Sequence, residues 1–134
     1  MPARRHERHF SLEEAEAALG EIRPLVEELA ALKQSLDEEG FRFMPLPEQP
    51  EAQKHHTNGH HPPPAAFVRL VHLLHILTEQ GIQVRDLAGG LIDFPHIRDS
   101  GEEVYLCWRL GEETIAFWHP LDTGFAGREP LATL

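Results

Sequence analysis

The spacing of hydrophobic residues changes abruptly at Gly81, and this change limits the folds open to the chain. Before Gly81, apolar residues recur every three to four positions, as on one side of an α-helix. After Gly81 the period is close to two, as in "QVRDLAGGLIDFP" and "EEVYLCWRLGEETIAFWH", which is typical of β-strands. Helices followed by strands predict an α+β fold: two long antiparallel helices packed on a small antiparallel β-meander of about four strands.

The first helical segment spans residues 10–43. Ser11 and Glu14 have the spacing of a capping box, in which each side chain binds the backbone amide of the other residue. Gly40 suits the end of the helix, and Pro24 is expected to kink the helix or to divide it in two. Apolar residues at alternating three- and four-residue steps form a heptad stripe: Leu12, Ala15, Leu19, Ile22, Val26, Leu29 and Leu36. Such a long stripe predicts packing against a second helix, in the same chain or in another.

A second helix is expected at residues 65–81. Its apolar side is formed by Phe67, Leu70, Val71, Leu74 and Leu77. Residues 44–64 hold six prolines and no hydrophobic pattern, so they are interpreted as a linker that lets the chain reverse direction. Four histidines of this linker (His55, His56, His60 and His61) are potential metal ligands, but a proline-flanked tract lacks the fixed geometry of a specific site. Residues 1–9 are polar and aperiodic and are expected to form a flexible N-terminal tail.

Residues 82–119 are predicted to form two hairpins, and residues 120–134 a C-terminal tail. If Gly111 and Glu112 form the second turn, Trp108 lies opposite Ile115 and Tyr105 lies opposite Trp118. Both faces of the sheet then carry large apolar groups, and one helical layer covers only one face. The second face is expected to contact the tail or a second subunit. Three aromatic residues are the candidate contacts to a partner: Tyr105, Trp118 and Phe125.

Charge and cysteine content restrict the classes of partner. The chain has a formal net charge of −10, which argues against binding to nucleic acid or to an anionic membrane. It has a single cysteine, Cys107, so an intramolecular disulfide is excluded and a cytoplasmic location is expected. Cys107 lies within an apolar strand pattern and is interpreted as a small buried hydrophobic residue.

Three segments of the C-terminal half resemble the prokaryotic family catalogued as "domain of unknown function 2203": "VRDLAGGLIDFP" (84–95), "YLCWRLGE" (105–112) and "WHPLDTGFAGR" (118–128). The resemblance includes the N-terminal "FSLEEA" helix and the second helix, and so covers most of the chain. It implies an architecture and no activity, and no catalytic residue follows from it. The proline- and histidine-rich linker resembles a local insertion between the two helices.

The strand ends carry the strongest candidate site. Asp93 and His96 end one strand, and His119 and Asp122 end another. If these ends lie side by side, two carboxylates and two imidazoles converge, as needed to bind a divalent transition metal such as zinc. The alternative is structural, with Asp93 in an ordinary cross-strand ion pair with Arg85.

A weaker candidate lies on the second helix, where His72, His75 and Glu79 share one face. These three side chains either form a secondary metal site or a solvated polar surface.

Two functions from different classes therefore remain open. The leading hypothesis is a homodimeric binding or assembly module that has no catalysis of its own and that contacts itself or a protein partner. The alternative is a metal-binding protein or metal-dependent hydrolase-like enzyme with its site at Asp93, His96, His119 and Asp122.

Overall fold

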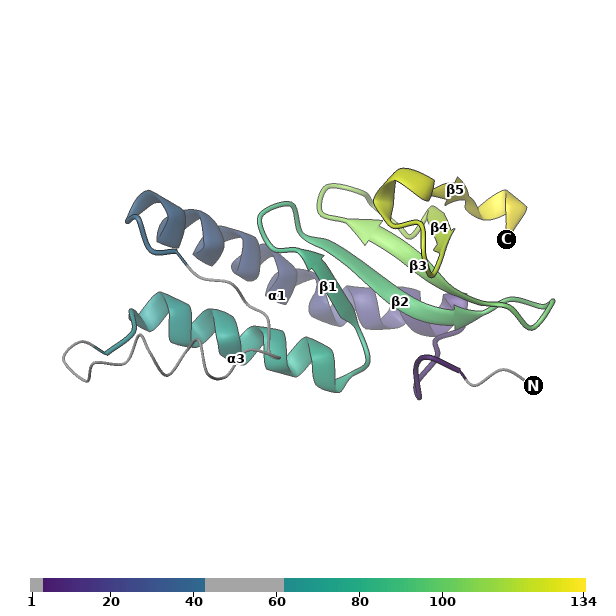
Figure 1. Ribbon diagram of the computed structural model, residues 1–134, viewed down its shortest axis with the longest axis horizontal. Coiled ribbons are helices and arrows are strands. Elements are labelled where there is room, and N and C mark those ends of the chain that lie inside the picture. Colours follow the sequence, from purple (N-terminus) through teal and green to yellow (C-terminus); the bar gives the residue numbers. More distant parts are fainter. Residues whose placement is uncertain (1–3, 43–61) are drawn as a thin grey trace.

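The computed structural model describes residues 4–42 and 62–134, and within them the fold is α+β, as the sequence predicts. Helices α1 (Leu12–Glu38) and α3 (Ala65–Glu79) run antiparallel, and α1 crosses one face of an antiparallel sheet (Figure 1). The sheet has five strands rather than about four, in chain order β1 (Gln83–Asp86), β2 (Leu91–Ile97), β3 (Glu103–Arg109), β4 (Phe117–Pro120) and β5 (Glu129–Pro130). The fifth strand belongs to the C-terminal tail and pairs antiparallel with β4. The four linker histidines lie outside the described residues.

Helix α1 is continuous despite Pro24. The capping box forms as predicted: the Glu14 amide donates to Ser11 Oγ, and the Ser11 amide donates to Glu14 Oε1 at 2.8 Å. Pro24 lacks the N–H that would bind the carbonyl of Gly20. Both residues are on the exposed side of the helix, where water can satisfy that carbonyl. The proline therefore neither divides the helix nor disturbs the buried stripe.

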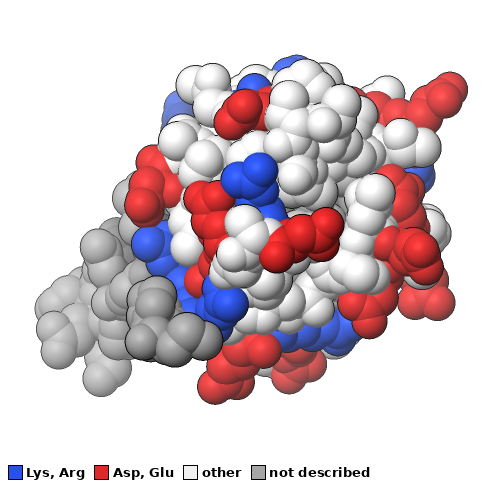
Figure 2. Space-filling view, turned by 90° about the vertical axis from the view of Figure 1, so that its right-hand side faces the viewer, with Lys and Arg blue, Asp and Glu red and all other residues white. Residues whose placement is uncertain are grey.

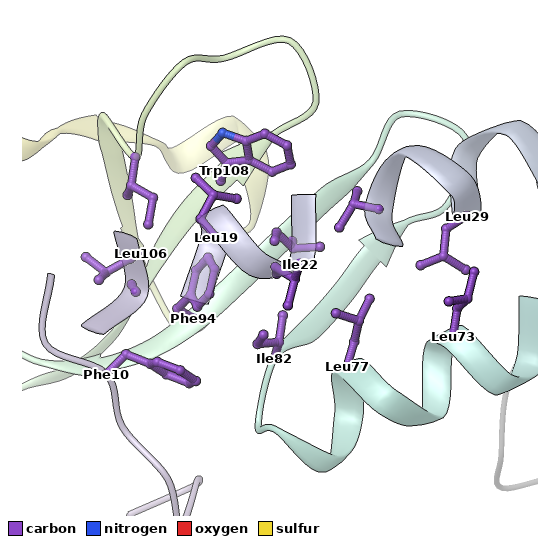
Figure 3. Packing of buried hydrophobic residues seen from close by; sticks show 14 of the residues in the cluster. Phe10, Leu19, Ile22, Leu29, Leu73, Leu77, Ile82, Phe94, Leu106 and Trp108 are labelled. Atoms are coloured by element: carbon purple, nitrogen blue, oxygen red, sulfur yellow. The ribbon is translucent and has the colours of Figure 1, made fainter. Parts of the chain in front are cut away.

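The core lies between α1, α3 and one face of the sheet. It contains the predicted α1 stripe together with strand residues such as Ile92, Phe94, Leu106 and Trp108 (Figure 3). Helix α3 contacts α1 and β1, so only a narrow side of it is covered. Leu70, Leu73 and Leu77 are its buried residues. Val71, which the helical wheel assigned to the apolar side, is instead 46% exposed, because Leu73 occupies the place against α1.

The pairing of β3 with β4 differs by one residue from the sequence prediction. Tyr105 lies opposite His119, and Leu106 lies opposite Trp118. The connection between β3 and β4 is one residue longer than predicted. Its backbone binds a core side chain, since the Glu112 carbonyl accepts a hydrogen bond from Trp108 Nε1 at 2.9 Å. Since neighbouring strand residues point to opposite faces, this shift moves Trp118 into the core and His119 to the other face of the sheet.

That other face, called here the outer face, is covered from two sides. The tail docks on one side, where the Arg128 guanidinium lies 4.0 Å from the ring centroid of Phe117, the residue opposite Cys107. Residues 4–9, called here the N-terminal strap, lie on the other. The sequence predicted a flexible tail at this position, but polar side chains of the sheet hold it: the Arg5 and His6 amides both donate to the carboxylate of Glu103. The strap has no apolar pattern because its contacts are hydrogen bonds and ion pairs.

Candidate metal centre

The four strand-end residues do not converge as a group. Asp93 and His119 meet on the outer face of the sheet. His96 lies three residues after Asp93 in a regular strand and thus points to the opposite face, where its Nδ1 is 2.7 Å from the Phe10 carbonyl oxygen. Asp122 is exposed and forms an ion pair with Arg5 at 3.1 Å. The structure therefore assembles half of the predicted set.

Asp93 and His119 form a buried charge pair. They come from β2 and β4, and their side chains are each 2% exposed. Nε2 of His119 lies 3.1 Å from both carboxylate oxygens of Asp93. Burial on its own would lower the pKa of His119, but the hydrogen bond and negative charge of Asp93 raise it above its ordinary value. We assign the pair as imidazolium and carboxylate, because Nε2 donates to the Asp93 oxygens only when it carries a proton.

The orientation of the His119 ring is set by the backbone. Its Nδ1 lies 2.7 Å from the carbonyl oxygen of Pro120. A carbonyl only accepts hydrogen bonds, so Nδ1 must carry a proton and donate it. This leaves Nε2 as the nitrogen directed into the protein interior. A histidine whose Nδ1–H is bound by a backbone carbonyl is oriented as metal-ligating histidines commonly are.

Cys107 completes a group of three potential ligands. It lies on β3 directly opposite Asp93, between the strands that carry Asp93 and His119. One ligand atom from each of the three residues lies within 4.8 Å of the other two. Burial, followed by the charge of Asp93, raises the pKa of the Cys107 thiol. Without a metal ion this cysteine is therefore a neutral thiol.

A shell of polar and aromatic side chains surrounds the three residues. Arg85 Nε donates to Asp93 Oδ2 at 3.0 Å, as the sequence predicted, although the residue directly opposite Asp93 is Gln83. The Arg85 guanidinium also lies 4.8 Å from the ring centroid of Tyr105. The Tyr105 ring contacts that of His119 at 5.4 Å between centroids.

The charges of this group are compatible with a divalent ion. With imidazolium, carboxylate and thiol, the three side chains sum to zero charge. A divalent ion bound by neutral imidazole, carboxylate and thiolate also sums to zero, because the metal replaces two protons. Arg85 therefore experiences the same net charge in both states, and its presence beside Asp93 does not oppose the metal. Tetrahedral zinc requires ligand atoms about 3.5 Å apart. His119 Nε2 and the Asp93 oxygens are already 3.1 Å apart, so it is the Cys107 sulfur that would need to approach by about 1 Å.

The secondary candidates on α3 are arranged differently. His75 Nε2 lies 3.0 Å from Glu79 Oε1, with both side chains about two-thirds exposed. His72 is exposed on the same helix. Asp93, Cys107 and His119 are the one set of three potential ligands close enough together within residues 4–42 and 62–134.

The three aromatic residues proposed as partner contacts also differ in location. Tyr105 and Trp118 are 2% and 4% exposed and are covered within the chain itself. Phe125 is 42% exposed and packs against the guanidinium of Arg128, with 4.7 Å to the ring centroid. None of the helices that the structure describes has the length and hydrophobicity needed to cross a membrane.

Cys107 was missed as a candidate ligand because its role depends on strand register. Alternation places Asp93, Cys107 and His119 on one face only when Tyr105 pairs with His119. The predicted pairing, one residue off, put His119 on the core face. A correct length for the connection after Arg109 would have revealed the group from the sequence.

Comparison with known proteins adds a family and no activity. Neither the curated proteins nor the solved structures gave a match. The family model described as "Uncharacterized conserved protein (DUF2203)" matches residues 8–131, which include both helices, all the strands and the candidate metal ligands. The chain therefore belongs to the domain of unknown function 2203 family.

Proposed function

We propose that the chain is a metal-binding protein whose centre consists of Asp93, Cys107 and His119. The observation that carries this proposal is the burial of three different potential ligands with their ligand atoms within 4.8 Å of one another. Thiolate and imidazole together favour zinc among the common divalent ions. Three protein ligands leave one tetrahedral position for water or another molecule, which is the arrangement of catalytic rather than structural zinc sites.

The test is metal content by elemental mass spectrometry, on tag-free protein purified without nickel or cobalt resin. We expect close to one zinc per wild-type chain and at least a tenfold loss in Cys107→Ser, which changes the ligand with little change in volume. Cobalt added to the metal-free wild type should give a thiolate-to-cobalt charge-transfer band that Cys107→Ser lacks.

Two controls separate this centre from other histidines. His96→Gln removes an imidazole from the opposite face of the same sheet and should leave the metal content unchanged, whereas His119→Gln should abolish it. A variant lacking His55, His56, His60 and His61 should also keep its metal. Equal metal content in the wild type and in a folded Cys107→Ser variant would refute the proposal.

Assembly into a homodimer is the second candidate function. The surface that favours it is the side of α3 that faces away from α1. Val68 and Val71 are 54% and 46% exposed and lie three residues apart on that helix. Burial of both on each copy of a two-fold dimer would remove apolar surface from water at a self-complementary contact. The proposed partner is a second copy of the chain, with α3 against α3.

This assembly predicts a mass of about two chains in light scattering at micromolar concentration. The double variant Val68→Gln/Val71→Gln should be monomeric. Thr114→Gln, at an exposed position in the connection before β4, is the matched control and should remain dimeric. A wild-type monomer across this concentration range would exclude the dimer without affecting the metal centre.

A further inference from the structure

We infer that the N-terminal strap is an opening cover over the metal centre and that Glu103 is the latch that holds it closed. This inference rests on the proposed metal-binding function, because it assigns the strap the task of controlling access to that site.

One carboxylate binds the strap at three points. Glu103 Oε1 accepts from the Arg5 amide at 2.7 Å, and Glu103 Oε2 accepts from the His6 amide at 3.0 Å. The His9 Nε2 nitrogen lies 2.7 Å from the same Oε2. The Glu103 side chain is 8% exposed, so the strap screens it almost completely from water. Burial alone would raise the pKa of Glu103, but these hydrogen bonds lower it to about 2, and the latch is charged at neutral pH.

The latched strap lies against the wall of the metal centre. His6 Nε2 is 2.6 Å from the hydroxyl oxygen of Tyr105, and the Tyr105 ring contacts that of the ligand His119. Arg85 covers the same tyrosine ring. The three ligands are between 0% and 2% exposed, so an ion reaches them only after part of this cover moves.

The strap can move without unfolding the protein. Its side chains from Arg4 to His9 are exposed or half-buried, and the next residue, Phe10, is the first fully buried apolar side chain among the described residues and belongs to the core. A depression of about 280 Å³ between the strap and the end of α3 is lined by Arg5, His6, Glu7, Arg8, Thr78, Glu79 and Gly81. The strap is thus not sealed against α3 along its whole length, and opening it breaks polar contacts that water can replace.

The side-chain contacts of Arg4 and Arg5 are exposed and weak. Arg4 Nη1 donates to the Gly101 carbonyl, and Arg5 pairs with Asp122, whose side chain is 85% exposed. Figure 2 looks onto the end of the molecule where the strap and the C-terminus lie, and acidic and basic side chains are interspersed over it. Exposed ion pairs contribute little to stability, so Glu103 is the contact whose loss should release the strap.

The experiment combines limited trypsin digestion with the rate of metal exchange. Trypsin cleaves after Arg4, Arg5 and Arg8, within the strap, and this readout does not depend on metal. Glu103→Gln replaces the accepting carboxylate by an amide whose NH₂ faces other hydrogen-bond donors, and we expect at least tenfold faster cleavage at these bonds. Removal of cobalt by a chelator should accelerate by a similar factor. Glu102→Gln is the matched control, since Glu102 pairs with Arg98 and makes no contact with the strap.

The outcomes are distinguishable. Unchanged strap cleavage in Glu103→Gln would show that Glu103 is not the latch. Faster cleavage with an unchanged rate of cobalt removal would show that the strap does not cover the metal centre. If the protein takes up no cobalt at all, the metal-binding function fails, and the cover over it fails with it.

Discussion

In the metal-free protein, Asp93→Ala is expected to lower the free energy of unfolding by about 3–5 kcal/mol. The substitution leaves the buried imidazolium of His119 and the guanidinium of Arg85 without their counter-ion. Breaking one member of a buried charge group is costly since the other charges stay in a poorly solvated environment. Urea unfolding followed by circular dichroism measures the difference. Asp99→Ala, at an exposed turn, is the control and should change stability by less than about 0.5 kcal/mol. Equal effects of the two substitutions would show that the buried pair contributes little.

The same substitution should have a defined pH dependence. The pKa of His119 is raised in the folded protein, so its protonation stabilises the fold below its unfolded value of about 6.5. This contribution is lost as the pH rises through the folded pKa. The stability difference between the wild type and Asp93→Ala should therefore be larger near pH 6 than near pH 9. An increase with rising pH would contradict the imidazolium–carboxylate assignment.

Trp108→Ala is expected to have an effect of similar size, about 3–5 kcal/mol, for a different reason. Trp108 is fully buried in the cluster shared by α1 and the sheet, and its removal leaves a large cavity. It also removes the hydrogen bond from Nε1 to the Glu112 carbonyl, which shapes the connection between β3 and β4. Chemical unfolding again provides the measurement.

Trp108→Phe separates these two contributions. It keeps most of the buried volume and loses the hydrogen bond, so it should cost about half as much as the alanine substitution. If both variants are destabilised equally, the hydrogen bond to the connection outweighs the packing. A loss below about 1 kcal/mol in Trp108→Ala would show that the core repacks around the missing ring.

The connection that Trp108 holds also explains why only two of the three ligands were predicted from the sequence. Asp93 and His119 were identified because each is an ionisable residue at the end of an apolar strand pattern. Cys107 was assigned to packing, since an apolar neighbourhood is the usual setting of a buried cysteine. Its position beside the other two depends on a one-residue difference in the connection, and hydrophobic alternation is compatible with either register.

The strap illustrates a second kind of limit. Residues 4–9 have no hydrophobic period, and their order comes from hydrogen bonds to Glu103, about a hundred residues away in the chain. Helix α3 shows a third limit of prediction from sequence. The helical wheel predicts a broad apolar side, and the position of α1 determines which part of that side is buried. Leu73 is buried and Val71 is exposed for that reason.

The α+β class, the capped first helix with its buried stripe and the antiparallel strands could all be predicted from the sequence. They follow from local periodicity and capping, which act between residues a few positions apart. The register of β4, the docking of the strap and the meeting of Asp93, Cys107 and His119 became evident from the packed structure alone. Those contacts join residues distant in the chain, and their geometry depends on how each connection packs.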